Sequence, residues 1–596
     1  MKVLVLGGGP GGLYAAILLR KVHPEWSVEL IERNPSDATY GWGIVFSDRT
    51  LASFREADAT SYREIVDRFV LWEVIEVRHR GQAARCGGNV FAGMSRKLLL
   101  DVLQRRAREL GVVLTFRSEL GDPSRLEAYD LCIAADGANS FVRRSFASTF
   151  RPRVQLGRSK YAWFGTDQLF DAFTFIFRAT EHGLFQAHVY PHIGAVATMV
   201  IECAESTWHA AGLDQASEAE NVAFCERVFR EDLGGHRILA NKSDWLSFPT
   251  IRNRSWRHGR LVLLGDAAHT AHFSVGSGTK LAMEDAIALA SAFGRHAVDV
   301  ERALDEYELE RRPVVEALQQ AALESQEVFE NSARYAHFSA PALAFHLLTR
   351  SSRISYDELR RRDSSFIDRI DSEFFDAHDE RARPPGTRRL APPPAFAPLR
   401  LRRLELANRV VLAPAPADGG RGLRGEAASA ALVRSALGGA GLMLTEIFAV
   451  SPEGRITPDC SGIYRAETAA GLRRLAELVH EQTDTKLGVQ IGHAGRRGSM
   501  RPRREGLDRP LEGGAAWPLL SASAIAYAPG HPLPSEMTRA AMDRVRDDFV
   551  RAARTADRAG ADLLQLHAAQ GYLLWSFLSP VSNRRTDSRG GSLERR

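Results

Sequence analysis

Six residues near the N-terminus have the types and spacing of a dinucleotide-binding turn. Residues 7–12 read Gly-Gly-Gly-Pro-Gly-Gly and satisfy the pattern GxGxxG. Gly7 allows a tight turn, Gly9 lets the backbone approach a pyrophosphate, and Gly12 permits close packing of a helix on a strand. The N-terminus of the following helix adds partial positive charge. The predicted chemistry is the binding of a dinucleotide through its pyrophosphate.

The elements that must hold this turn can be predicted from the same region. Residues 2–6 form a short apolar run that predicts a strand, residues 13–20 predict an amphipathic helix, and residues 28–31 predict a second strand. This β-turn-α-β order opens a doubly wound α/β sheet. Glu32 follows at the end of the second strand, where it would accept hydrogen bonds from ribose hydroxyls, and we assign Arg33 to the same cofactor site.

FAD and NAD sites share the glycine turn, so later motifs must decide between them. Two later segments each place an acidic residue beside a glycine, and a glycine-containing turn follows the second: Asp136 and Gly137, Gly265 and Asp266, then Gly276 and Gly278. With these motifs in this order, the sequence resembles the FAD-dependent aromatic hydroxylases, the class A flavoprotein monooxygenases. The resemblance implies that Asp266 binds the ribityl chain of FAD and that Arg96 contacts the FAD diphosphate. It also implies that the helix N-terminus after the turn points toward the flavin pyrimidine ring.

Three segments resemble a narrower branch of that family: 41–48, 164–175 and 265–280. This branch contains the salicylyl-CoA 5-hydroxylases and the 2-aminobenzoyl-CoA monooxygenase/reductases, and an indole-pathway hydroxylase shares much of it. The resemblance covers about residues 1–375. It implies a Rossmann-type FAD-binding fold with a β-sheet substrate region, and hydroxylation of an aryl-CoA thioester at ring C5 with O2. No second dinucleotide fingerprint is visible, so NAD(P)H is expected as a transient reductant.

Two histidines follow shortly after the motif at Gly265–Asp266. His269 and His272 are candidate catalytic bases, and a role in shaping or packing the flavin pocket is the open alternative. Many relatives have a proline where this chain has His272. A strong base is not required, because a 2-amino or 2-hydroxy substituent activates the para carbon of the ring, and the protein mainly excludes water and orients the substrate. Three phenylalanines are either pocket-lining or plain core residues: Phe173, Phe175 and Phe185.

A Pro- and Arg-rich stretch at 381–398 predicts an extended linker between a hydroxylase domain, 1–380, and a second domain, 399–596. Helical patterns alternate with four short apolar runs in the second domain: 408–414, 441–446, 487–491 and 562–567. Strand–helix alternation of this kind predicts a (β/α)8 barrel.

Four segments of the second domain resemble the old yellow enzyme-type FMN reductases: 408–416, 438–455, 489–499 and 567–596. The resemblance implies that Gln490 binds the flavin ring, that His567 binds a carbonyl oxygen of the substrate, and that Tyr572 donates a proton. The role of His567 is physically reasonable, because charge grows on that oxygen as hydride adds to an enone. The chain departs from the family at four places: Gln570, Ala415, Ile447 and the segment 417–432.

The second domain is short for a complete barrel. Residues 398–596 number 199, against about 250 for a typical eight-stranded barrel. Only four strands can be placed, so we expect an incomplete (β/α)8 TIM barrel in a chain that is truncated or is half of a split protein. FMN binding is expected to be poor, and ene-reductase activity absent, unless a second chain completes the barrel. A homo-oligomer is the other expected assembly.

Composition excludes several classes of protein. Lys and Arg number 78 and Asp and Glu 73, and this mild excess is spread among acids, so we expect no nucleic-acid partner. The five cysteines form no CxxC pair, which argues against a structural metal site and against secretion. No apolar run reaches 18 residues, so we expect a cytoplasmic protein without membrane partner. Two other functions stay open: a hydroxylase of an indole or other small arene, and a non-catalytic flavin-binding protein that needs a partner chain.

Overall fold

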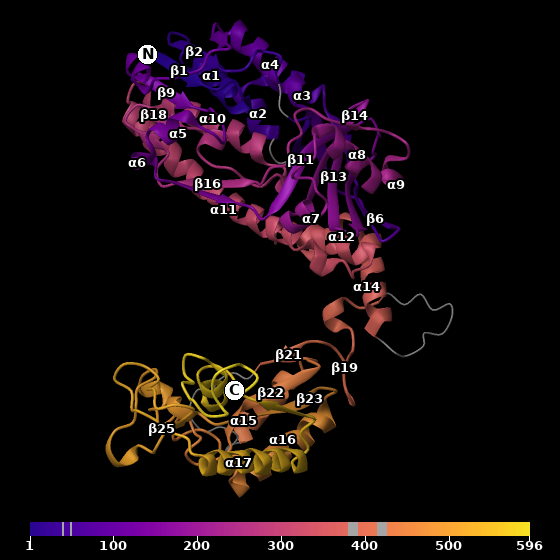
Figure 1. Cartoon of the computed structure of the whole chain (residues 1–596). Coiled ribbons are helices and arrows are strands. Elements are labelled where there is room, and N and C mark those ends of the chain that lie inside the picture. Colours follow the sequence, from indigo (N-terminus) through magenta and orange to yellow (C-terminus); the bar gives the residue numbers. More distant parts are fainter. Residues whose placement is uncertain (39–40, 48–50, 379–390, 414–425) are drawn as a thin grey trace. The chain divides into compact units, whose positions relative to one another are not determined.

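The structure is a computed structural model that describes residues 1–38, 41–47, 51–378, 391–413 and 426–596. The chain forms two compact units, Met1–Ile370 and Asp371–Arg596 (Figure 1). Residues 381–390 of the predicted linker lie outside the described residues. The predicted domain boundaries at 380 and 399 therefore stay predictions.

The first unit carries the glycine motif on a six-stranded sheet. The strands lie in the order β17-β18-β9-β1-β2-β8, and all neighbours except β17 and β18 are parallel. Their bounds are β1 Lys2–Leu6, β2 Ser27–Glu32, β8 Val113–Phe116, β9 Leu131–Ala134, β17 Arg257–His258 and β18 Leu261–Leu263. Strands β1 and β9 are buried almost throughout, as a parallel sheet covered on both faces requires. The strands predicted at 2–6 and 28–31 are confirmed.

Long helices pack around this sheet: α1 Pro10–Val22, α4 Arg96–Glu109, α10 Gly278–His296 and α11 Val300–Glu330. Helix α1 contains the predicted helix 13–20 and begins at Pro10, whose fixed φ suits the first turn. Shorter elements complete the unit: β3 Gly43–Ser47, β4 Val70–Trp72, β7 Phe91–Ser95, β10 Pro152–Leu156, β16 Pro249–Asn253, α2 Leu51–Ala57, α3 Ala59–Val66, α5 Phe141–Ser145, α6 Ala147–Phe150, α12 Ala340–Thr349 and α13 Tyr356–Arg362.

A second sheet of seven strands forms the predicted β-sheet region. Its order is β15-β11-β14-β13-β12-β5-β6. The bounds are β5 Ile75–His79, β6 Gln82–Cys86, β11 Ser159–Thr166, β12 Phe173–Thr180, β13 Gly183–Ile193, β14 Val196–Ala204 and β15 Ile238–Leu239. Side chains alternate between the two faces. One face is apolar and packs with residues of α7 Glu205–Ala210, α8 Glu218–Val228 and α9 Arg230–Leu233. The other face meets Phe273 and Phe329.

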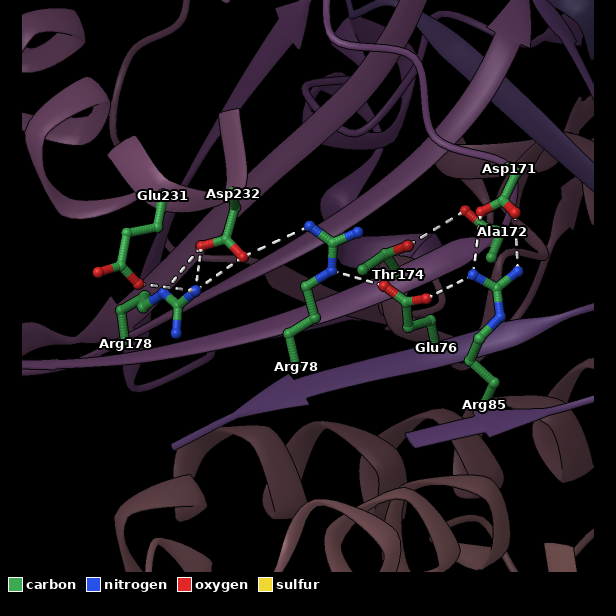
Figure 2. A network of polar contacts seen from close by, with 9 residues as sticks. All are labelled: Glu76, Arg78, Arg85, Asp171, Ala172, Thr174, Arg178, Glu231 and Asp232. Atoms are coloured by element: carbon green, nitrogen blue, oxygen red, sulfur yellow. Dashed lines mark hydrogen bonds and ion pairs between the residues drawn. The ribbon is translucent and has the colours of Figure 1, made fainter. Parts of the chain in front are cut away.

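A row of alternating charges ties strands β5, β6 and β12 to the end of α9 (Figure 2). Glu76 is 4% exposed and accepts from Arg78 at 2.5 Å and Arg85 at 2.6 Å. Asp232, equally buried, accepts two hydrogen bonds of 2.8 Å from Arg178. Burial nevertheless raises the pKa of Asp232, against the opposing charge of Arg178. Each buried carboxylate thus has guanidinium partners, which is the condition for burying a charge.

The second unit contains a four-stranded parallel sheet in chain order: β21 Val411–Leu412, β22 Leu442–Ala449, β23 Lys486–Gly492 and β26 Leu563–Leu566. All four predicted strands are confirmed. The longer helices are α14 Ser364–His378, which begins in the first unit, α15 Glu426–Ala436, α16 Ala466–Gln482 and α17 Arg539–Arg558; α18 Leu573–Leu578 is short. Apolar residues of β22, β23, α16 and α17 form the core. Parallel neighbours separated by helices are the arrangement of a βα barrel.

Strand β26 has a sheet neighbour on one side only, among the described residues. Leu564 and Leu566 on this strand are 39% and 55% exposed. An unpaired edge with exposed apolar side chains is a natural pairing site for a further strand.

Among the residues that the structure describes, no helix is both long enough and apolar enough to cross a membrane.

Candidate active site

The glycines of the first motif lie where a side chain would have little room at two of the three positions. Gly7 has φ +106°, and a Cβ there would lie 2.3 Å from the carbonyl oxygen of Ala135. A Cβ on Gly12 would lie 2.1 Å from the carbonyl oxygen of Gly7, so only glycine lets α1 pack this closely on β1. Gly9 instead borders open space, with no atom within 4 Å of a built Cβ. That space lies where a pyrophosphate is expected to approach the helix N-terminus.

The turn is held from the neighbouring strand. Glu32 accepts from the backbone N–H of Gly8 at 2.7 Å and from that of Asn34 at 2.8 Å. Its carboxylate is half-buried and keeps acceptor capacity for a ribose. Arg33 is exposed at the end of β2. Helix α1 has no side-chain cap at its N-cap Gly9, so its first N–H groups are available to an anion.

One guanidinium group joins the motif at Asp136–Gly137, the second motif, to the motif at Gly265–Asp266, the third motif. Arg143 donates to the carbonyl oxygen of Ala267 at 2.9 Å and also binds that of Ala138. Asp136 accepts from the backbone N–H of Phe141 at 2.7 Å, which fixes the start of α5. Gly137 has φ +82° and borders open space.

Asp266 belongs to the next acidic motif, Gly265–Asp266. The aspartate is exposed, whereas its neighbours Gly265 and Ala267 are buried. The surrounding protein raises the pKa of Asp266, and the positive charge of Arg96 opposes this. Burial lowers the pKa of Arg96, and Asp266 in turn opposes that shift. The two side chains therefore lie close enough to act on each other.

The residues of the first unit fit FAD. Gly276 has φ +61°, and Gly278, at the start of α10, borders open space. Helix α10 also lacks a side-chain cap at its N-terminus, as α1 does. Three glycines facing open space, two uncapped helix N-termini and the projecting carboxylate of Asp266 are the donors and clearances that a dinucleotide flavin needs.

His269 is held in a buried ion-pair network. Its Nε2 lies 2.8 Å from Asp285, which also accepts from the backbone N–H of Gly265 at 3.2 Å and from Arg311 at 2.9 Å. The imidazole packs against Trp256 with ring centroids 4.9 Å apart. This arrangement anchors the third motif to α10. The predicted role of His269 as a base stays a prediction.

His272 lies at one end of a chain of hydrogen bonds. Its Nδ1 accepts from the backbone N–H of Ser274 at 3.3 Å and lies 2.8 Å from the Ser274 hydroxyl. Ser274 Oγ lies 2.8 Å from Ser325 Oγ, which accepts from Arg350 at 2.7 Å. Because Nδ1 accepts, the proton of a neutral ring resides on Nε2. Burial lowers the pKa of His272 to about 4, so the ring is neutral.

Sequence reasoning missed a buried pair on the second sheet, His188 on β13 and Glu202 on β14. His188 Nε2 lies 3.4 Å from Glu202 Oε2, and both residues are at most 2% exposed. The only available signal was the alternation of polar residues along both strands. Phe175 packs against His188 at 5.1 Å, whereas Phe185 points to the opposite, apolar face and belongs to the core. Phe173 stacks on Tyr190, on the same face as His188.

In the second unit, the predicted residues gather at the C-terminal ends of the strands. His567 and Tyr572 have ring centroids 5.2 Å apart, and burial lowers the pKa of His567 and raises that of Tyr572. Gln490 donates from Nε2 to the carbonyl oxygen of Thr445 at 2.7 Å. An open recess of about 550 Å³ is lined by Arg496, Arg497, Tyr527, Gln570, Gly571, Tyr572 and Trp575. The roles predicted for these residues stay predictions.

The structure describes some of the places where the second unit departs from the reductase family in sequence. Ile447 lines a small pocket with His493 and Tyr572. Gln570 has φ +57°, a left-handed conformation that non-glycine residues rarely adopt. Ala415 and residues 417–425 lie outside the described residues.

Comparison with known proteins agrees with this geometry. The FAD binding domain family matches residues 1–322, and the NADH:flavin oxidoreductase / NADH oxidase family matches residues 394–596. A salicyloyl-CoA 5-hydroxylase from a Streptomyces species is 44% identical over 389 residues, covering 64% of this chain and 75% of that protein. Protodeoxyviolaceinate monooxygenase of Chromobacterium violaceum is 32% identical, covering 57% of this chain and 92% of that protein.

The second unit has its own relatives. NADPH dehydrogenase of Bacillus subtilis is 36% identical over 204 residues, covering 34% of this chain and 56% of that protein. The chain thus spans about half the length of this relative. Among solved structures, the tetrameric form of 2-methyl-3-hydroxypyridine-5-carboxylic acid oxygenase is 21% identical, covers 61% of this chain and 98% of that chain, and has a TM-score of 0.48.

Fold, site and relatives together define a flavoprotein monooxygenase that acts on an aromatic small molecule with FAD, a nicotinamide reductant and O2. The chain belongs to the FAD binding domain family. Residues 394–596 match the model of the NADH:flavin oxidoreductase / NADH oxidase family, a TIM-barrel family whose members are associated with FMN.

Proposed function

We propose that this chain hydroxylates an aryl-CoA thioester, salicylyl-CoA or 2-aminobenzoyl-CoA, at ring C5. The observation that carries the proposal is the 44% identity to a salicyloyl-CoA 5-hydroxylase over three quarters of that protein. The fused reductase domain supports it, because a dearomatised enone product is what such a reductase would accept. FAD, when bound, supplies oxygen from O2 in a form that can be transferred to the ring.

The residues of the first unit would divide the work among themselves. Gly9, Gly12 and the uncapped N-terminus of α1 would hold the pyrophosphate, and Glu32 a ribose. Asp266 would bind the ribityl chain of FAD, and Arg96 would contact its diphosphate. His269, fixed by Asp285, would position the turn that carries Asp266. These are binding and positioning tasks, which suits a reaction whose reactive oxygen comes from the cofactor.

Aromatic side chains would exclude water from the reacting ring. Phe273 packs against Tyr161 at 4.9 Å, Trp163 at 5.9 Å and Phe248 at 6.1 Å. All four side chains are half-buried, so the aromatic cluster is partly open to solvent. Water exclusion matters here because it protects a reactive oxygen species from wasteful decay.

The second candidate function is hydroxylation of an indole or another small arene. The identity of 32% to a protodeoxyviolaceinate monooxygenase favours it. A third candidate is a flavin-binding protein without activity until a partner chain joins it. NADH oxidation should be measured with salicylyl-CoA, 2-aminobenzoyl-CoA and free indoles, with product mass as readout. Coupled turnover of free indoles but not of the CoA esters would replace the first candidate by the second. FAD binding without stimulated oxidation would leave the third.

We infer that the second unit needs further strands to hold FMN. Phosphate sites in such barrels are usually formed by loops after strands seven and eight, whereas the described residues supply four parallel strands. The exposed edge of β26 is where further strands would pair. A second chain, or additional sequence, would provide them. Gln490, His567 and Tyr572 would then face the flavin and its substrate.

A further inference from the structure

The pair formed by His188 and Glu202 is buried without the contacts that buried polar groups normally have. Glu202 Oε1 and Oε2 and His188 Nε2 are inaccessible to solvent, and none has a partner in good hydrogen-bond geometry among the residues that the structure describes. The side chains of Ser159 and Gln186 act on the carboxylate, and both lower the pKa of Glu202. Their closest approach, 3.4 Å, is at the outer limit of a hydrogen bond. Leaving such groups unsatisfied costs stability, so their presence calls for a functional explanation.

The surroundings of the pair connect it to the predicted site. The His188 ring lies 5.5 Å from Phe273, the half-buried residue between the third motif and α10, and 4.5 Å from Phe329. The carboxylates of Asp266 and Glu202 both act on the Tyr161 hydroxyl. The pair therefore lies on the face of the sheet that meets Phe273, beside Tyr161, whose pKa both Glu202 and Asp266 raise.

Charged and titratable groups face Glu202 from every packed element. They are His188 on β13, Tyr161 on β11, His272 before α10, Glu330 at the end of α11, and, acting on both histidines, Arg350 after α12. Burial raises the pKa of Glu202 to about 7, with His272 opposing and Glu330 reinforcing the shift. Burial lowers the pKa of His188 to about 3, so the ring is a neutral acceptor.

We propose that His188 and Glu202 together accept and hold the proton of a ring hydroxyl while the aromatic substrate takes up oxygen, which makes a phenolic ester the preferred substrate. This inference rests on the proposed function. A phenol reacts fastest as phenolate, whereas a neutral ring amine donates electrons without losing a proton. A base of ordinary strength therefore accelerates the reaction of salicylyl-CoA, and it does not accelerate that of 2-aminobenzoyl-CoA.

The proposed step balances without any further reactant. The O–H bond of the substrate breaks, its electron pair stays on oxygen, and the proton bonds to the His188–Glu202 pair. The para carbon then bonds one oxygen atom derived from O2, and the other oxygen leaves as water with the two electrons of NAD(P)H. Finally the para carbon loses its own proton to solvent, and the pair returns the held proton to the substrate oxygen as the ring regains aromaticity.

Comparing two substrates on one variant tests the proposal. Glu202→Gln removes the titrating group with little change in shape. It should lower kcat with salicylyl-CoA by about 10²-fold, the typical contribution of a general base, and change kcat with 2-aminobenzoyl-CoA less than twofold. His188→Gln should behave alike. A fluorinated salicylyl-CoA with a more acidic hydroxyl should recover most of the lost rate. An equal loss with both esters, or no loss with either, would overturn the proposal.

The matched control is Glu76→Gln, because Glu76 is a buried glutamate of the same sheet that pairs with Arg78 and Arg85 (Figure 2) and has no contact with His188 or Glu202 among those described. It should keep the wild-type ratio of the two rates. FAD content and rate of flavin reduction by NADH show whether each variant is folded and loaded.

A second readout does not depend on turnover. An infrared difference spectrum of the FAD-loaded chain between pH 5 and pH 9 should show a protonated carboxyl band that disappears as pH rises and is absent from Glu202→Gln. If wild type oxidises NADH with no ester but shows this band, the proposed function fails and the proton-holding pair stands. If the band is missing from wild type, the pair holds no proton and the inference fails.

Discussion

The most informative perturbation of stability is Glu202→Gln followed across pH. Burial raises the pKa of Glu202 from 4.5 to about 7. In this range the unfolded chain has lost the Glu202 proton, whereas the folded chain keeps it. The folded state then binds more protons, so wild-type stability falls as pH rises. At about 1.4 kcal/mol per pH unit, the difference of about 2.5 pH units amounts to roughly 3 kcal/mol.

The variant cannot lose this stability, because its amide does not titrate. At pH 5 the two proteins should unfold with similar free energies, since a protonated acid and an amide have similar size. From pH 5 to pH 8 the Glu202→Gln chain should gain roughly 2–3 kcal/mol relative to wild type, because a small part of the effect is already present at pH 5, above the unfolded pKa of 4.5. Other groups with a shifted pKa, such as His272, titrate in both proteins and largely cancel in the difference.

The assay is equilibrium urea unfolding at pH 5, 6, 7 and 8, read from the fluorescence of released FAD at one fixed FAD concentration. Fixing that concentration is necessary because a ligand stabilises the folded state by mass action. Glu76→Gln, which removes two ion pairs outside the site, should cost roughly 1–3 kcal/mol at every pH. A flat difference between Glu202→Gln and wild type, or one that favours wild type at high pH, would refute the reasoning.

Three further predictions concern the cofactors and their supports. Gly12→Ala should destabilise even the flavin-free chain, because its Cβ meets the Gly7 carbonyl oxygen at 2.1 Å, whereas Gly9→Ala should fold normally and lose FAD affinity at least tenfold. Melting temperatures without FAD and fluorescence titrations with FAD distinguish the two effects. Normal FAD binding by Gly9→Ala would exclude a pyrophosphate at that position. Asp285→Asn should lower the free energy of unfolding by roughly 3–5 kcal/mol, because it removes the partner of His269 and Arg311; a loss below about 1 kcal/mol in urea unfolding would show that the network carries little stability. Flavin released by heating and separated by chromatography should be FAD alone, and one equivalent each of FAD and FMN per chain would show that the second unit needs no further strands.

Local signals allowed the backbone of the glycine motifs to be predicted, whereas the cofactor-binding roles of their residues stay predictions. The turn at 7–12 and the motif around Asp266 depend on backbone conformations and short spacings that the sequence displays directly. The strands of the second unit could be predicted for a related reason, since each is a short apolar run bounded by polar residues. His567 and Tyr572 lie five residues apart, so their proximity also follows from local structure.

Long-range contacts could not be predicted in the same way. The His188–Glu202 contact depends on the register of β13 against β14, which pairs Gln186 with Glu202. Arg350 reaches the carbonyl oxygen of Ser274 across 76 residues of chain, and only tertiary packing brings them together. The partner of His269 proved to be Asp285, within α10, rather than a substrate-facing group. No single-sequence pattern encodes these tertiary contacts.

The central claim is that the first unit holds FAD and uses it to place one atom of O2 on an aromatic ring. Turnover of salicylyl-CoA with NADH under isotopically labelled O2, followed by mass spectrometry, tests this most directly. The account predicts one labelled oxygen atom in the hydroxylated product, together with one NADH consumed per product. Consumption of NADH with all labelled oxygen recovered as hydrogen peroxide, and an unlabelled ring, would contradict it.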